Sequence, residues 1–376
     1  MKLYYFSEMP HHEYPDAEGD KYPSLRLAFP NTFFSPEVAR RNYQRYLDEY
    51  DFADQAGFAG LMINEHHSTP SCVNVSANMT ASILARTTKR AKLLILGNIL
   101  PIQDNPVQMA EQIAMADLIS GGRVLSGFVR GVGVESWWAN SNPVHNRERF
   151  EECHDLILTC WTTPGPSRWE GRHYHSRHVN PWCLPLQKPH PPIWVPGTAS
   201  PETAVWAGRM GYTYVPFLVS FDVARELFDF YRQGAAEAGR TVTPDTLGFL
   251  ICAVTADTKA RALEAGRHFV WRMGPTLRGP VDYFSPVGMR SRAASQFALR
   301  ARSVSLSKMS YEELVDNYYI VAGTPDEVAE RFARVQKELG IGHLLLEAQE
   351  SRMDHPTTMR SIELMGKSVI PALASA

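Results

Sequence analysis

A carboxylate and two histidines directly follow an apolar run near the start of the chain. Residues 61–64 read LMIN and are followed at once by Glu65, His66 and His67. The run has the length of a buried strand, and in a parallel α/β barrel the carboxyl ends of the strands carry the chemistry. A lone histidine there would most simply be structural, but three polar residues together favour a catalytic site. Histidine changes its charge near neutral pH, which suits proton transfer or hydrogen bonding.

Two arginines and the start of a later helix could bind an anion. Arg130 closes the apolar run 124–129, and Arg147 falls in the first turn of the next predicted helix. Thr198 and Ser200 follow a later strand, where a helix start with free amides and hydroxyls is a ready phosphate site. A salt bridge explains Arg130 alone about as well, and an ordinary capped helix explains Ser200. Their coincidence favours phosphate.

Residues 131–136 (GVGVES) nearly match a dinucleotide-binding fingerprint. The last glycine is replaced by Ser136, and residues 137–143 do not continue as a helix, so that interpretation is discounted. Trp137 and Trp138 wall a flat ligand or substrate, or simply pack a loop, at about equal odds.

Three histidines in a proline-rich stretch invite a metal interpretation. His173, His175 and His178 lie away from any strand end, and no acidic residue nearby in the sequence completes a ligand set. We therefore predict no metal site.

Strand and helix patterns alternate along the whole chain, which predicts one domain over residues 1–376: an α/β fold of the (β/α)8 TIM-barrel type. A long loop over 9–35 follows strand one, a surface hairpin is expected within 164–192, and an insertion over 255–321, part of it a mobile lid, precedes strand eight. The predicted strands span 3–6, 59–64, 93–100, 124–129, 193–195, 213–217, 247–255 and 343–347. The predicted helices span 36–56, 73–86, 106–118, 146–161, 201–210, 222–238 and 259–271, with another ending near 370.

Composition narrows the function classes. The chain has 376 residues, with 38 Lys and Arg against 40 Asp and Glu, and a net charge of −2. This balance argues against nucleic acid or an anionic membrane as the main partner. Five dispersed cysteines without a Cys-x-x-Cys pair indicate reduced thiols in a cytoplasmic protein. Neither a signal segment nor a membrane span is expected.

Several motifs, in order, resemble those of the bacterial luciferase-like flavin monooxygenases. They are residues 65–67 (EHH), 105–111 (NPVQMAE), 120–123 (SGGR) with 128–131 (FVRG), 187–194 (QKPHPPIW) with 197–203 (GTASPET), and 321–327 (VAGTPDE). Each motif is weak alone, but the ordered set covers nearly the whole chain.

The resemblance implies a (β/α)8 barrel that takes reduced FMN from a separate flavin reductase and oxygenates a substrate with O2 through a C4a-peroxyflavin. It places His66 as the catalytic histidine. It assigns the flavin phosphate to Arg130 and Arg147, helped by Thr198 and Ser200. It sets Asn98 near the isoalloxazine, where many members have a non-proline cis peptide. Members are commonly dimers, so a homodimer is expected.

The chain also departs from luciferase. Val129 stands where luciferase has a reactive cysteine, and the 9–35 loop is longer, so a long-chain aldehyde is not the expected substrate. A medium-to-large organic molecule contacting Trp138 and His67 is predicted instead. The alternatives are an F420-dependent dehydrogenase or reductase on the same fold, a metal-dependent barrel hydrolase, and a non-catalytic flavin-binding subunit.

Overall fold

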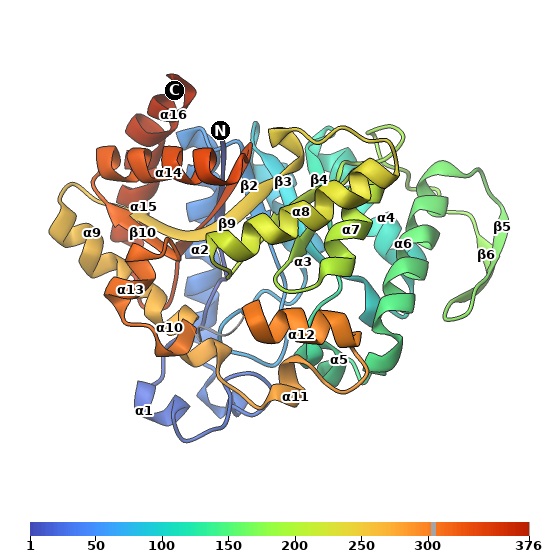
Figure 1. Ribbon diagram of the computed structural model, residues 1–376, viewed down its shortest axis with the longest axis horizontal. Coiled ribbons are helices and arrows are strands. Elements are labelled where there is room, and N and C mark those ends of the chain that lie inside the picture. Colours follow the sequence, from blue (N-terminus) through green and yellow to red (C-terminus); the bar gives the residue numbers. More distant parts are fainter. Residues whose placement is uncertain (302–305, 376) are drawn as a thin grey trace.

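A curled parallel sheet of nine strands forms the centre of the protein (Figure 1). The computed structural model describes residues 1–301 and 306–375. The strand order is β10-β9-β11-β1-β2-β3-β4-β7-β8, and isolated bridges Tyr214↔Leu247 and Phe217↔Leu250 bring the β8 edge beside β9. The predicted α/β class with a parallel sheet is confirmed. The strands are β1 (Lys2–Ser7), β2 (Gly60–Ile63), β3 (Lys92–Ile99), β4 (Val124–Val129), β7 (Ile193–Gly197), β8 (Thr213–Pro216), β9 (Gly248–Thr255), β10 (Ile320–Gly323) and β11 (His343–Gln349).

Both faces of the sheet are buried, which explains why its strands read as nearly continuous apolar runs. Side chains alternate between two hydrophobic clusters, as successive residues of a strand must. In β1, for example, Tyr4 and Phe6 belong to a cluster with Trp194 and Leu345. Tyr5 packs into the larger cluster with the helices.

The helices begin and end largely where their capping residues predict. Ser35 accepts the Val38 N–H at 3.4 Å at the start of α2, and Gly57, at φ 98°, ends that helix. The helices after the strands are α2 (Pro36–Ala56), α3 (Ala77–Thr87), α4 (Pro106–Ser120), α6 (Asn146–Thr162), α7 (Pro201–Met210), α8 (Phe221–Glu237), α14 (Pro325–Leu339), α15 (His355–Leu364) and α16 (Ile370–Ser375).

Two glycines let α7 and α8 cross at close range. A Cβ on Gly208 would lie 2.0 Å from Tyr231 O, and one on Gly234 would lie 2.0 Å from Val205 O. The packing of these helices fixes where α7 begins, and that helix start belongs to the site described below.

Some elements differ from expectation. The predicted surface hairpin is present as β5 (Ser167–Glu170) and β6 (His175–Val179). The helix expected over 259–271 is broken into α9 (Lys259–Gly266) and α10 (Phe269–Met273). A short helix, α5 (Gly133–Trp138), overlaps residues 131–136, the stretch that was discounted as a dinucleotide-binding fingerprint. β10 is an additional strand at the end of the predicted insertion. It was not predicted because an apolar run of four residues is too short for periodicity to identify.

The loop of residues 9–35, here called the early loop, meets the 255–321 segment at one end of the molecule (Figure 1). The short helices at this end are α1 (Asp16–Gly19), α5, α10, α11 (Val281–Phe284) and α12 (Arg292–Ala301). Arg26 Nε donates to Thr276 O at 3.1 Å, and Arg278 Nη1 lies 2.9 Å from Asp20 Oδ1. The 255–321 segment also holds α13 (Tyr311–Asp316).

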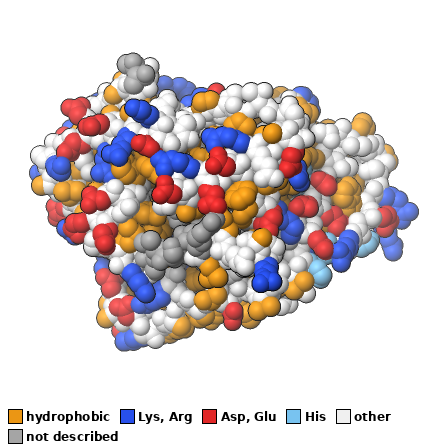
Figure 2. Space-filling view, viewed as in Figure 1, with side chains coloured by type: hydrophobic (Ala, Val, Ile, Leu, Met, Phe, Trp, Pro, Cys, Tyr) orange, Lys and Arg blue, Asp and Glu red, His pale blue; other side chains and the backbone are white. Residues whose placement is uncertain are grey.

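Acidic and basic side chains are intermingled on the face shown in Figure 2. Among the described residues, no helix combines the length and apolar character needed to cross a bilayer.

Candidate active site

One cavity brings the strand-end residues of the sheet together with the early loop and the 255–321 segment. Apolar side chains line much of it, and the polar side chains form two groups, each connected by its own contacts. The apolar lining includes Phe6, Met62, Leu96, Ile99, Val129, Val215, Phe217, Leu250, Leu277 and Phe284. The first polar group is Glu8, Arg26, Asn64, Glu65, His66, Glu135, Arg272 and Glu347, and the second is Arg130, Thr198, Ser200, Thr203 and Arg290.

His66 lies between two carboxylates at the mouth of β2. Its Nδ1 is 2.8 Å from Glu135 Oε1, and its Nε2 is 3.9 Å from Glu8 Oε2. The side chain is 22% exposed, so the ring reaches the cavity while its partners stay buried. With Nδ1–H donating to Glu135, Nε2 lies near Glu8 but forms no hydrogen bond within the described residues, which suits a ring that holds or moves one proton.

Glu65 is half-buried next to His66 in the sequence and caps the next helix. It accepts the Ala77 N–H at the start of α3 at 2.9 Å. Burial raises the pKa of Glu65 to about 7, partly opposed by that hydrogen bond. The carboxyl group is therefore a candidate proton carrier near neutral pH.

We expect Glu65→Gln to remove one source of pH-dependent stability. The folded pKa of about 7 exceeds the ordinary 4.5, so the stabilisation is complete below 4.5 and is lost as pH rises through 7. The resulting change in the free energy of unfolding is at most roughly 3 kcal/mol. This is an upper limit because Glu65 lines the cavity, where solvent screens its charge. Glutamine keeps the acceptor for Ala77 and does not titrate. Urea unfolding measures the free energy of unfolding at pH values between 4.5 and 7, and this free energy should fall with rising pH more for wild type than for the variant. The same pH dependence in both proteins would contradict the prediction.

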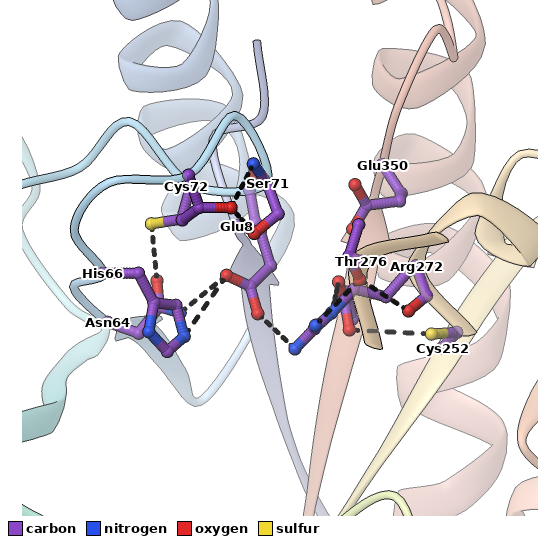
Figure 3. A network of polar contacts seen from close by, with 12 residues as sticks. Glu8, Asn64, His66, Ser71, Cys72, Cys252, Arg272, Thr276 and Glu350 are labelled. Carbon is purple, nitrogen blue, oxygen red and sulfur yellow. Dashed lines mark hydrogen bonds and ion pairs between the residues drawn. The ribbon is translucent and has the colours of Figure 1, made fainter. Parts of the chain in front are cut away.

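A buried charge network continues from His66 into the centre of the protein (Figure 3). Glu8 Oε2 accepts from Asn64 Nδ2 at 2.9 Å, and Glu8 Oε1 accepts from Arg272 Nη2 at 2.5 Å. Arg272 Nε also donates to Glu347 Oε1 at 3.2 Å. Figure 3 shows Glu8 between the imidazole of His66 and the guanidinium of Arg272.

The charges in this network stabilise one another. Burial disfavours the charged form of Glu8, but Arg272 and then His66 together lower its pKa. Burial raises the pKa of Glu347 and of its neighbour Glu350. Glu8 and Arg272, which bind each other at 2.5 Å, form the central ion pair of the network.

The second polar group gathers two half-buried guanidiniums at the start of α7. Arg130 Nη1 lies 3.3 Å from Ser200 Oγ, and Arg147 Nη2 lies 2.8 Å from Thr203 Oγ1 and 3.5 Å from Ser200 Oγ. The predicted phosphate residues Arg130, Arg147 and Ser200 thus meet at one point, although Arg147 itself does not line the cavity. Thr198 lines it next to them.

The positive charges of the guanidiniums repel one another, and a bound anion would offset this repulsion. Burial, then the charges of Arg147 and Arg290, lowers the pKa of Arg130 to about 9. Arg147 Nη1 lies 3.5 Å from Glu151 Oε1 but lacks an aligned hydrogen-bond acceptor. Buried donors that repel one another at a helix start fit a phosphate group.

The 255–321 segment reaches this group. Met289 O accepts from Arg130 Nη2 at 3.1 Å, and Ser291 Oγ donates to Glu202 in the first turn of α7. The segment therefore covers the anion-binding end of the cavity.

Asn98 lies in β3 with both side-chain amide atoms buried and without a hydrogen-bond partner among the described residues. It does not line the cavity; the neighbouring Gly97 does. The non-proline cis peptide joins Leu96 to Gly97, close to the position the resemblance implied.

The two residues predicted to touch the substrate pack against each other. The rings of His67 and Trp138 stack with centroids 3.5 Å apart and planes 4° from parallel. Neither is among the residues that line the cavity. Their contact with a substrate stays a prediction.

The hairpin histidines have an acidic neighbour in space, contrary to what the sequence led us to expect. His173 Nε2 lies 2.8 Å from Glu148 Oε2, and His145 Nδ1 lies 3.8 Å from the same oxygen. An acidic partner is therefore present, supplied by α6 rather than by the neighbouring sequence. Arg172 Nη1 also binds Glu148, at 2.8 Å.

Sequence reasoning missed Glu8, Arg26, Glu135, Arg272 and Glu347. Glu8 directly follows β1 and Glu347 lies in β11, so the strand-end rule that singled out His66 could have found both. Glu135 lies in the discounted glycine-rich stretch. Arg26 and Arg272 come from a loop and a broken helix, where the sequence carries no signal.

Comparison with known proteins identifies the family and several relatives of this chain. The family described as luciferase-like monooxygenase matches residues 25–343. An uncharacterized protein, y4wF of Sinorhizobium fredii, is 30% identical over 172 residues, which cover 46% of this chain and 49% of y4wF. The 3,6-diketocamphane 1,6-monooxygenase of Pseudomonas putida is 24% identical over 85% of this chain and 90% of its own.

Solved structures share the fold. Monooxygenase RslO1 from Streptomyces bottropensis has a TM-score of 0.75 at 21% identity, covering 99% of both chains. The oxygenating constituent of the Pseudomonas putida diketocamphane monooxygenase, solved with FMN, has a TM-score of 0.70 at 22% identity, over 89% of this chain and 94% of that one. An F420-dependent secondary alcohol dehydrogenase has a TM-score of 0.69 at 17% identity, covering 99% of this chain and 98% of that one.

Proposed function

The chain belongs to the luciferase-like monooxygenase family, and we propose that it is the oxygenase of a two-component system that uses reduced FMN and O2. The observation that carries this proposal is the cavity itself. An imidazole held by Glu135 lies in one polar group, a cluster of guanidiniums at the start of α7 forms the other, and apolar side chains line the same cavity.

The residues present fit FMN in this cavity. Arg130, Arg147 and Ser200, with Thr198 and the α7 amides, would hold the phosphate, and Asn98 with the strand ends of β3 would lie near the ring system. Reduced FMN, when bound, supplies the electrons that activate O2. His66 would hold or deliver a proton at Nε2, oriented by the hydrogen bond from Nδ1–H to Glu135.

The surrounding chain would exclude water. We assign the whole chain to one barrel domain, closed between β8 and β9 by the bridges described above. The 255–321 segment would serve as the lid over the phosphate end, because Met289 O accepts from Arg130 and Ser291 donates to Glu202 at the start of α7. The proposal extends to a separate flavin reductase, a homodimer, a cytoplasmic location and a medium-to-large organic substrate.

A deazaflavin-dependent dehydrogenase is the second candidate. The similarity to the F420-dependent secondary alcohol dehydrogenase favours it, because the same anion-binding group would serve either cofactor. The metal-dependent hydrolase has less support, since the His145, Glu148 and His173 cluster lies outside the cavity.

Anaerobic titration with reduced FMN, followed by admission of O2, tests the proposal. We expect saturable binding, then substrate oxidation that requires O2, on a panel of ketones, organosulfur compounds and polycyclic aromatics. Absence of reduced-FMN binding, or turnover with F420 in the absence of O2, would overturn it. An F420 result would establish the second candidate.

A further inference from the structure

Arg26 is a buried cation whose terminal nitrogens have no hydrogen-bond partner in the described part of the chain. Arg26 is 5% exposed. It belongs to the early loop and lines the cavity. Its Nε donates to Thr276 O at 3.1 Å, which fixes the plane of the guanidinium. Within residues 1–301 and 306–375, neither Nη1 nor Nη2 donates a hydrogen bond, and the side chain forms no ion pair.

The carboxylates nearby already have closer partners. Glu8 binds Arg272 at 2.5 Å and Asn64 at 2.9 Å. Glu347 binds Arg272 at 3.2 Å, and Glu135 binds His66 at 2.8 Å. Arg26 is thus the cation left over in this polar group.

The terminal nitrogens of Arg26 are not among the fully enclosed polar atoms, so they remain accessible from the cavity that Arg26 lines. An incoming acceptor could therefore form charge-assisted hydrogen bonds with them. The two terminal nitrogens form a fork whose geometry matches a carboxylate bidentately. The low local dielectric strengthens that contact further. Arg26 also lies in the same polar group as His66, away from the anion-binding group of Arg130 and Ser200, so the phosphate does not account for it.

We propose that Arg26 binds a carboxylate of the substrate, so that the enzyme acts on organic acids. The inference rests on the proposed function and names its substrate class. The acid group would anchor at Arg26 and leave the rest of the molecule against the apolar wall, within reach of the reactive centre beside His66.

The test uses FMN-loaded protein and matched probes: benzoate and 2-naphthoate, each beside its uncharged amide. Calorimetry should show wild type binding the acids about 10- to 100-fold more tightly than the amides, as expected for charge-assisted hydrogen bonds. Arg26→Met should abolish this preference, and Arg26→Lys should retain part of it. Equal binding of acids and amides by wild type would overturn the proposal, as would a preference that survives Arg26→Met.

Arg278→Met is the matched control. Arg278 joins the same two segments, through Asp20 Oδ1 and Gly19 O, without lining the cavity. It should keep the preference for acids. Equal loss in both variants would mean that Arg26 merely anchors the loop, and would overturn the assignment. Flavin titration of wild type separates the two proposals, because FMN binding without acid preference refutes only this one.

Discussion

His66→Ala is expected to bind reduced FMN with near wild-type affinity and to lose most of its oxygenation activity. Positioned acid–base groups typically contribute about 100- to 10,000-fold to a rate. His66 is the imidazole in the cavity, and Glu135 at 2.8 Å fixes its ring. Anaerobic flavin titration and product formed per O2 consumed measure the two effects separately. A fully active variant would refute the role assigned to His66.

Two further variants sharpen this test. Glu135→Gln keeps an acceptor for the His66 ring but removes the charge, so we expect a smaller rate loss together with a shifted pH–rate profile. A merely structural role for Glu135 would leave that profile in place. His178→Ala removes an exposed histidine of the β5–β6 hairpin and serves as the control, with activity expected to match wild type.

Arg130→Ala is expected to weaken FMN binding by about 10- to 100-fold, the range for losing charge-assisted hydrogen bonds to a phosphate. Riboflavin, which lacks the phosphate, provides the internal comparison. Wild type should prefer FMN over riboflavin, and the variant should lose that preference. Equal discrimination by both proteins would count against the phosphate assignment.

Arg130 also holds Asn146 and Met289 O, so its removal could disturb the fold near the cavity. Arg149→Ala is the matched control. Arg149 lies in α6 and donates to Pro101 O and Gln103 O at 2.6 and 2.8 Å, outside the cavity. That variant should lose some stability by thermal unfolding and keep the preference for FMN.

The sequence alone determined the alternation of strands and helices, because both depend on local patterns. Apolar runs marked all eight predicted strands, and capping residues such as Ser35 and Gly57 marked helix ends. The strand-end rule also found His66 and Arg130, since in a parallel sheet one edge collects the residues that follow each strand.

Tertiary structure alone decided which side chains meet. Glu8 and Arg272 are 264 residues apart and touch at 2.5 Å, and Glu148 reaches the hairpin histidines from another element. The tertiary structure also places Arg26 in the lining of the cavity, where its side chain forms no ion pair with a carboxylate of the described residues. Such pairings depend on chain closure over long separations and on competition among buried charges for partners, and neither leaves a periodic trace in the sequence.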